Sequence, residues 1–344
     1  MKPFVFDPAD AHARAAAPGM VITEVIRQNG KRIFDKGYQV TSSDLDTLAT
    51  IDRTFHAVRL EPDDVHENDA AIRLGLAIAG EGIERRPPVQ SRVNLRAARK
   101  GLLRVDASKI QAMNVLMGIA VFSLIDRIPV IPGKIIAGAK ITPVAIPERL
   151  LAAAEVLASG SPVVQVKAFI PHKVGIIATD GLKEAMQARF QETVRRKLHW
   201  YGSEPIGFVD IPADSIAISE TVRNFVAQGA TLILAAGGNT IDPLDPTLSA
   251  LPDLGAELIS FGAAAHPGSM FWLAEMGEIP IVNLASCSMY SKATVADLVL
   301  PWILAGERVT KADMAGIGYG GLLDRDMAFR FPPYDVESTD ESSE

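Results

Sequence analysis

The stretch TLILAAGGNTIDPLD, residues 231–245, decides the fold of the C-terminal half of this chain. Its first residues, 231–234, have the β-branched and aliphatic character of a strand buried in a parallel sheet. Gly237 and Gly238 follow, and because they lack Cβ atoms the backbone can turn sharply and bring its N–H groups close to a phosphate. In open α/β sheets, ligands bind beyond the carboxyl ends of the strands. The stretch therefore predicts an anion site.

Two carboxylates lie behind the glycines on the same loop. Asp242 and Asp245 can hold a hard cation such as Mg²⁺ beside a bound phosphate, and Thr240 adds a hydroxyl group. The alternative for a Gly-Gly pair alone is a plain turn from strand to helix. A solvated helix cap would need only one of these polar side chains. We therefore favour the ligand site.

From residue 174 onward, strand-like and helix-like segments alternate. The expected strands are VGIIAT (174–179), IGFVDI (206–211), TLILAAG (231–237), ELISFG (257–262) and IPIVNL (279–284), with helices at 183–198 and 216–226 and a closing segment at 292–304. This alternation is typical of crossover units around a mostly parallel sheet. We predict a doubly wound α/β domain over residues 166–330, with helices on both faces of its sheet.

Residues 1–165 follow another pattern and are expected to form an accessory domain of mixed α and β structure. Short β-like pieces (MVITEVI, KRIFDKGYQV, FHAVRL) carry many turns. Helices are expected at 69–80, from Asp106 or Ser108 onward, and at 147–158, where Pro147 has the first helical position. The boundary between the two domains is expected within 159–173.

The bulk composition sets limits on the fold and the partners. With 344 residues, of which 48% are hydrophobic and 22% charged, the chain is long enough for two or three globular domains. A net charge of −7 argues against nucleic acid or an anionic membrane as the main partner, because both select basic surfaces. The longest apolar region, 113–141, is interrupted by charges and prolines and cannot span a bilayer.

The single cysteine, Cys287, excludes an intramolecular disulfide, and the six histidines show no metal-ligand spacing. The amino terminus carries acidic residues and prolines in place of the basic and apolar segments of a signal peptide. We therefore expect a cytoplasmic protein without structural zinc. The acidic segment 331–344 is expected to be a disordered tail.

The segment AGGNTIDPLD, residues 236–245, resembles the signature of the molybdopterin-binding domain of molybdenum cofactor biosynthesis proteins. That signature has a small hydroxyl residue, two glycines, a short variable stretch and an aspartate. Asp245 lies seven residues after Gly238 (245 − 238), as the family aspartate does after its second glycine. Ala236 stands where the family has the hydroxyl residue. The resemblance implies a catalytic Asp245, a metal held by Asp242 and Asp245, and cofactor contacts from Gly237, Gly238, Asn239 and Thr240.

The resemblance covers roughly residues 174–304. VGIIATDGL is similar to the family's first strand and its Thr-Gly turn, with one residue inserted. FVDIPADSIAISETV places Asp214 near a position where the family often has a catalytic acid. HPGS (266–269) is similar to a Pro-Gly-Lys segment, with Ser269 in place of the lysine. The cofactor contacts implied by the first and third of these segments are Thr179, Asp180, Gly181, Pro267 and Gly268.

NLASCSMYSK (283–292) departs from the family, because molybdenum-inserting members carry a Pro-Gly-Asn-Pro loop there. This chain instead places hydroxyl groups and a lysine before a helix, whose N–H groups and macrodipole favour a phosphate. The residues that would bind the cofactor here are Ser286, Ser288, Ser291 and Lys292. An ordinary serine-capped helix is the equal alternative. Catalysis by Cys287 is disfavoured, since no histidine is near it in sequence.

The first half resembles the same enzymes more weakly, in EPDDVHENDAAIRLGLAIAG and GKIIAGAKITPVAIP. This implies a domain that closes over the cofactor or supports dimerisation. Its acidic cluster is interpreted as a solvated turn with carboxylates at a helix start, and consists of Asp63, Asp64, Glu67 and Asp69. Arg92 and Asn94 are possible ligand contacts, second to a role as polar surface residues. GIGYGG at 316–321 matches a dinucleotide-binding pattern, but no predicted strand precedes it and it is interpreted as a loop.

The function that this resemblance implies is binding of molybdopterin, a phosphorylated pterin dithiolene, in molybdenum cofactor biosynthesis. The reaction would be adenylyl transfer with ATP and Mg²⁺, or insertion of molybdate. The alternative is a non-catalytic carrier that presents the cofactor to a recipient molybdoenzyme, which the changes at Ala236, Ser269 and 283–292 favour. A third possibility is an enzyme that shares only the fold. Related proteins are commonly dimers or trimers, so a homo-oligomer and contacts with other cofactor-biosynthesis proteins are expected.

Overall fold

The computed structural model describes residues 1–179, 181, 183–237, 242–284 and 294–334. The chain divides into two compact units. The first consists of Met1–Arg99, Leu103–Asp126 and Pro132–Val166, and the second of Lys100–Leu102, Arg127–Ile131 and the chain from Lys167 onward. In the described part of the chain, no helix has the length and apolar character needed to cross a bilayer.

The second unit is built on a six-stranded sheet with the order β16-β15-β17-β20-β19-β18. Its strands are β15 (Lys173–Ala178), β16 (Glu204–Asp210), β17 (Leu232–Ala236), β18 (Glu257–Phe261), β19 (Trp272–Met276) and β20 (Ile279–Leu284). The first three neighbour pairs run parallel, and β19 pairs antiparallel with both β20 and β18. The predicted mixture of helices and strands is confirmed, but the pairing is mixed, and a doubly wound parallel sheet is not shown.

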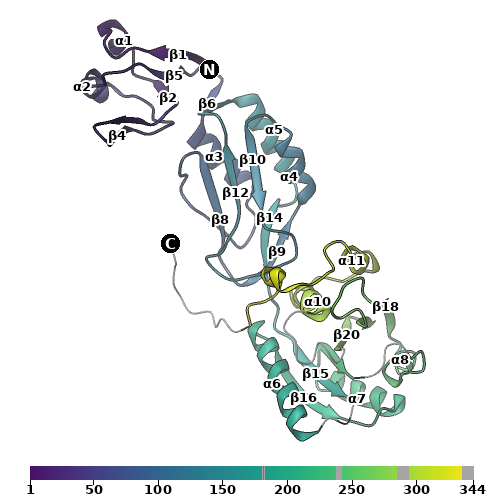
Figure 1. The fold of residues 1–344 in the computed structure, drawn as a ribbon. Helices are drawn as coiled ribbons and strands as arrows, with labels where there is room; N and C mark the ends of the chain where they lie inside the picture. Colours follow the sequence, from purple (N-terminus) through teal and green to yellow (C-terminus); the bar gives the residue numbers. More distant parts are fainter. Residues whose placement is uncertain (180, 182, 238–241, 285–293, 335–344) are drawn as a thin grey trace. The chain divides into compact units, whose positions relative to one another are not determined.

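Hydrophobic side chains of the central strands alternate between two clusters, one on each face of the sheet. Ile176 and Ala178 pack in the same cluster as residues of α6 (Glu184–Trp200) and α10 (Val295–Leu304). Ile177 packs instead with residues of α7 (Ser215–Ala227) and with residues in and after α8 (Pro246–Ser249). These helices flank the strands in the lower part of Figure 1. The expected helices at 183–198 and 216–226 are therefore present, with ends shifted by one or two residues.

Phe225 of α7 packs where the parallel strands β15 and β16 carry glycines at paired positions. Gly175 and Gly207 are register partners, and a Cβ atom built on either would lie 2.6 Å or 2.5 Å from the Phe225 ring. Real Cβ contacts are not that short, so the two glycines make room for the ring. This close approach ties α7 to the edge of the sheet.

The first unit contains several small sheets. β7 (Ile83–Arg85), β8 (Arg92–Ala97), β12 (Ile135–Ile141) and β10 (Ile119–Ser123) form an antiparallel sheet. The helix α3 (Glu67–Ile78) packs on β8 and β12 and contacts α5 (Glu148–Ala158). Arg73 of α3 joins the two helices, since its guanidinium bonds both carboxylate oxygens of Glu148 at 2.7 Å and those of Glu155 at 2.9 Å.

The remaining elements are short. They are β1 (Lys2–Phe6), α1 (Ala11–Ala15), β2 (Met20–Ile22), β3 (Ile26–Gln28), β4 (Lys31–Phe34), η1 (Ser42–Asp44), α2 (Leu45–Ala49), β5 (Phe55–Arg59), β6 (Asp64–His66), β9 (Gly101–Val105), α4 (Ala107–Asn114), β11 (Pro129–Val130), β13 (Ala145–Pro147), β14 (Val164–Ala168), α11 (Lys311–Gly316) and η2 (Arg325–Arg330).

Three expectations need correction. Pro147 is the N-cap of α5 and not its first helical residue, because its ψ of 133° is extended. The expected disordered tail at 331–344 includes Phe331 and Tyr334, and both of these are buried in the core of the second unit. Glu67 is not part of a solvated turn, because only 2% of the residue is exposed. GIGYGG does form a turn after α11, as expected.

Candidate functional site

The carboxyl ends of the four parallel strands lie at one edge of the sheet. Ala178, the last residue of β15, is the register partner of Asp210 in β16 and of Ala236 in β17. Ala236 is in turn the partner of Leu284, the last residue of β20. The segments that follow these strands therefore start side by side, and they include three of the segments that carry the family resemblance.

Backbone hydrogen bonds hold the first residues of these loops together. Thr179 N–H donates to the carbonyl oxygen of Ala236 at 3.1 Å, and Ile211 N–H donates to Ala178 at 2.9 Å. Gly237 then turns the chain with a φ of +95°, in the left-handed region that favours glycine. Gly181 has a φ of +58° in the loop after β15. Gly237 and Gly181 thus have turn conformations after β17 and β15, at the edge where a ligand is expected.

Asp245 is buried, with 3% of the residue exposed, and is the N-cap of α8. Its Oδ1 accepts a hydrogen bond from Thr247 N–H at 2.8 Å and another from the Thr247 hydroxyl group. Pro246 has the first helical position. The residue expected to be catalytic therefore also has a structural task, which an asparagine can perform about as well.

Asp242 is exposed and folds back on its own loop. Its Oδ1 accepts a hydrogen bond from Leu244 N–H at 2.9 Å, while its carbonyl oxygen accepts one from Asp245 N–H at 3.0 Å. Within the residues that the structure describes, no group of three or more His, Cys, Asp and Glu side chains could hold a metal. A magnesium ion here would have one or two carboxylate ligands from the protein. Phosphate and water oxygens would supply the others, as is usual for Mg²⁺.

Asp214, the second expected catalytic acid, follows β16 and is the N-cap of α7. Its Oδ1 accepts a hydrogen bond from Ala217 N–H at 2.9 Å, and the side chain is exposed. Asp210, which the sequence analysis did not single out, ends β16 at the same edge. Only the strand register reveals its position beside Ala178.

The HPGS segment lies against the start of α10. A Cβ atom on Gly268 would lie 2.9 Å from the backbone nitrogen of Val295, and the φ of Gly268 is +110°. Thr294, the N-cap of α10, forms a capping box with Asp297, whose Oδ2 accepts bonds from Thr294 N–H at 3.1 Å and Oγ1 at 2.9 Å. The HPGS turn thus packs against the start of α10, which is held by its own capping box.

Asp297 also belongs to a buried network that the sequence analysis missed. Lys197 Nζ of α6 lies 2.8 Å from Asp297 Oδ1, and the Tyr334 hydroxyl group donates to the same oxygen at 2.8 Å. The Tyr201 and Tyr334 hydroxyl groups are 3.3 Å apart. Burial raises the pKa of both phenols well above the usual value. The available sequence signal was T-x-x-D at 294–297, which is typical of a helix start.

Several predicted contacts lie outside the described residues. They are Asp180, Gly238, Asn239, Thr240, Ser286, Ser288, Ser291 and Lys292, and Cys287, for which no role was expected, also lies there. The described members of the predicted set are Thr179, Gly181, Asp214, Gly237, Asp242, Asp245, Pro267 and Gly268.

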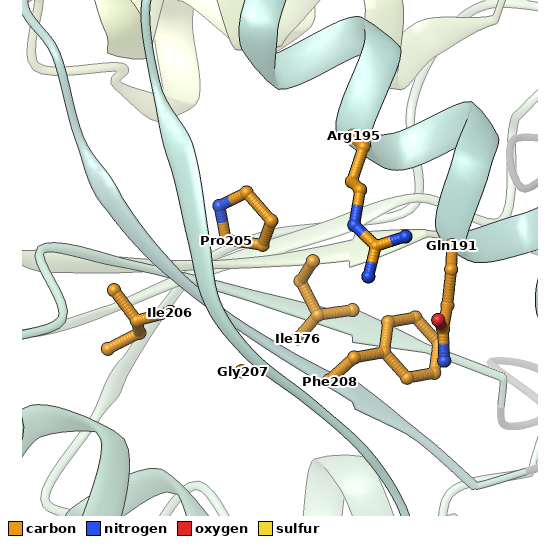
Figure 2. A pocket seen from close by; sticks show the side chains of 7 residues that line it. All are labelled: Ile176, Gln191, Arg195, Pro205, Ile206, Gly207 and Phe208. Atoms are coloured by element: carbon orange, nitrogen blue, oxygen red, sulfur yellow. The ribbon is translucent and has the colours of Figure 1, made fainter.

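A separate cavity of about 230 Å³ lies beside α6 and the edge strand β16 (Figure 2). Arg195 and Gln191 of α6 line it, together with Ile176 and the strand residues 205–208. These strand residues precede Asp210, so the cavity is formed by the body of β16 and not by the loop after it.

No protein-family model matches the sequence, and a search of curated proteins also finds no match. Among solved structures, a molybdopterin biosynthesis MoeA protein from Pyrococcus horikoshii is 14% identical, with 70% of this chain and 79% of that chain covered and a TM-score of 0.31. The tungsten cofactor synthesizing protein MoaB from Pyrococcus furiosus is 19% identical, covering 34% and 84%, with a TM-score of 0.27. A molybdenum cofactor biosynthesis protein from Corynebacterium diphtheriae, described as putative, is 19% identical, covering 44% and 99%, with a TM-score of 0.28.

Proposed function

We propose that this protein binds molybdopterin at the carboxyl edge of strands β15, β16, β17 and β20 and acts in molybdenum cofactor biosynthesis. The observation that carries the proposal is the register of Ala178 with Asp210 and Ala236, and of Ala236 with Leu284. This register brings the segments after Ala178 and Ala236, which resemble the family independently, to one edge. A ligand site is expected at such an edge.

The helices that follow these strands support binding of the pterin phosphate. α7 and α10 both begin after a strand that ends at this edge, and the dipole of a helix start favours a nearby anion. Gly237 adds a turn without a side chain next to Thr179. The phosphate would be held by backbone groups, which suits a chain with a net charge of −7.

The proposed reaction is adenylyl transfer. A phosphate oxygen of molybdopterin attacks the α-phosphorus of ATP, a new P–O bond forms, and pyrophosphate leaves. Asp245 and Asp242 would share a Mg²⁺ ion with the nucleotide phosphates, and backbone N–H groups would stabilise the charge that develops on the transferring group. Insertion of molybdate into the pterin is the other reaction that this site would serve.

A non-catalytic carrier is the second candidate, and three residue differences favour it. Ala236 lacks the hydroxyl group of the family signature, Ser269 stands in place of a lysine, and the 283–292 segment lacks the Pro-Gly-Asn-Pro sequence. Each change removes a group that would act on the substrate and leaves the backbone cradle in place. The recipient would be a molybdoenzyme.

One incubation separates the two candidates. The full chain is mixed with molybdopterin, ATP and Mg²⁺, and the pterin is analysed by mass. Adenylylated pterin that forms with the native chain and not with Asp245→Asn supports the transferase, because asparagine keeps the α8 cap while removing the charge. Binding without product supports the carrier, and product from a fully active Asp245→Asn variant contradicts the catalytic assignment.

The domain roles form part of the same proposal. Residues 166–330 form the molybdopterin-binding domain, residues 1–165 form an accessory domain, and residues 331–344 contain the acidic tail. A homo-oligomer is proposed as the working form, and sedimentation of the purified chain tests it.

A further inference from the structure

A second candidate site lies in the first unit and contains none of the residues of the proposed carboxyl-edge site. It is a cavity of about 550 Å³, within the size range of small-molecule sites. The turn after β4 lines one side of it with Lys36 and Gly37, and the start of α3 lines another with Glu67. Gln90, in the turn before β8, also lines the cavity.

Glu67 is the most informative residue of this cavity. Only 2% of the residue is exposed, and within the described residues its Oε2 atom has no hydrogen-bond partner. A buried carboxyl oxygen without a partner has a desolvation cost that a bound donor group would remove. Burial raises the pKa of Glu67, although the ammonium groups of Lys36 and Lys140 and a hydrogen bond with Ser91 oppose that shift.

The turn around Gly37 is shaped to accommodate this carboxyl group. Gly37 has a φ of +79°, and a Cβ atom there would lie 2.0 Å from Glu67 Oε1. The neighbouring His66 accepts a hydrogen bond from Asn68 N–H on Nδ1 at 3.3 Å, so its Nε2–H donates to the Gly37 carbonyl oxygen at 2.8 Å. The histidine thus fixes the turn over the glutamate.

The turn that contains Gln90 is held in a strained conformation. Gln90 and Ser91 both have positive φ, +49° and +65°, although neither is glycine. Lys140 Nζ bonds the Gln90 carbonyl oxygen and the Ser91 hydroxyl group, each at 2.8 Å, and Ser91 N–H donates to Asn68 Oδ1 at 3.3 Å. Strained backbone that several contacts hold in place is typical of ligand sites.

The charged side chains of the cavity favour a ligand that has a hydrogen-bond donor edge at one end and an anionic group at the other. A carboxylate accepts two parallel N–H bonds from a planar donor edge. Lys36 is exposed and has no ion-pair partner among the described residues, so it can pair with a phosphate. Arg32 also lines the cavity and is already paired with Asp35 at 2.7 Å.

We propose that this cavity binds a phosphorylated heterocycle that contains a 2-aminopyrimidin-4-one ring, with Glu67 accepting from the 2-amino and adjacent ring N–H groups and Lys36 pairing with the phosphate. Two sources share this chemistry, a pterin phosphate and a guanine nucleotide. The pterin source rests on the proposed function, whereas the guanine source does not.

Calorimetric titration of the full chain tests the inference with GMP, IMP, AMP and neopterin monophosphate as probes. IMP lacks the 2-amino group and AMP lacks both donors. We expect IMP to bind roughly tenfold or more weakly than GMP, and AMP not to bind measurably, because a hydrogen bond to a charged group has that effect on a dissociation constant. Whichever of GMP and neopterin monophosphate binds more tightly identifies the source.

Two variants and one control locate the binding. Glu67→Gln and Lys36→Met should each weaken the preferred probe at least about tenfold, and Lys36 is exposed, so its variant should fold normally. Glu81→Gln, an exposed glutamate of the same unit, should bind as the native chain does. Equal binding of AMP and GMP, native affinity in both cavity variants, or no binding of any probe would overturn the inference. The native affinity of Asp245→Asn for GMP keeps this test separate from the proposed function.

Discussion

Thr179 N–H donates a hydrogen bond of 3.1 Å to the carbonyl oxygen of Ala236. The bond joins the first residue after β15 to the last residue of β17, so two loops that are far apart in sequence begin at one point. Gly237 turns away immediately afterwards. A phosphate bound at this edge would therefore meet both loops, which is the geometric basis of the proposed function.

The packing of Phe225 against Gly175 predicts that a methyl group added at Gly175 lowers the stability of the protein. Gly175→Ala should lower the free energy of unfolding by about 1–3 kcal/mol, because its Cβ would lie 2.6 Å from the ring. Adding Phe225→Leu should recover part of the loss. Urea unfolding measures both, and Gly316→Ala, where nothing lies within 4 Å, is the control. Equal stability of Gly175→Ala and the native chain would contradict the close packing.

The buried Lys197–Asp297 pair predicts that neutralising Asp297 is costly. Asp297→Asn should reduce the free energy of unfolding by about 3–5 kcal/mol, since the buried Lys197 ammonium group would face a neutral amide in place of the Asp297 carboxylate. Tyr334→Phe removes one hydrogen bond from the same oxygen and should cost only about 1 kcal/mol. Similar losses in the two variants would show that the charge pair is not the dominant contact.

The two buried phenols predict a loss of stability at alkaline pH. Burial raises the pKa of Tyr201 and Tyr334 above the usual 10, so their contribution is complete below about pH 10 and is lost as the pH rises through their folded-state values. Unfolding midpoints should fall above pH 10, and less steeply in the Tyr201→Phe/Tyr334→Phe double variant. Absorbance at the tyrosinate band should show these two phenols ionising only as the chain unfolds.

The buried Glu67 predicts that stability also depends on pH between acid and neutral values. Because burial raises its pKa, its stability contribution is complete below the ordinary value of 4.5 and is lost as the pH rises through the higher folded-state value. Glu67→Gln should remove this slope and be more stable than the native chain at neutral pH. Thermal unfolding between pH 4 and 8 measures this slope, and identical slopes in both proteins would contradict the raised pKa of the buried Glu67 carboxyl group.

The parallel strands could be predicted from the sequence because strands buried on both faces appear as short aliphatic runs. The strand β19 could not be identified in this way, and it was missed although Gly277 and Glu278 form a two-residue turn between Met276 and Ile279. That turn makes β19 and β20 a hairpin, which requires antiparallel pairing. The mixed direction of the sheet depends on this local turn and not on hydrophobic pattern.

The candidate site was predictable only in part. The glycine turns and Asp245 followed from spacing, but the cap at Thr247 and the position of Asp210 depend on how strands pair. Glu67 was assigned to a solvated turn because its neighbours in sequence are acidic. Its burial depends on Gly37, which is distant in sequence and which no local pattern connects to it.

Hydrogen exchange of the full chain with and without molybdopterin tests the central claim most directly. The backbone amides of Thr179 and Ile211 lie at the carboxyl edge, and that of Asp245 lies at the start of α8 after β17. Those of Glu204 and Thr231 lie at the amino ends of β16 and β17. We predict slower exchange at the first three on binding and no change at the last two. Binding that protects Glu204 and Thr231 while leaving the carboxyl-edge amides unchanged, or no binding of molybdopterin at all, would contradict the proposed site.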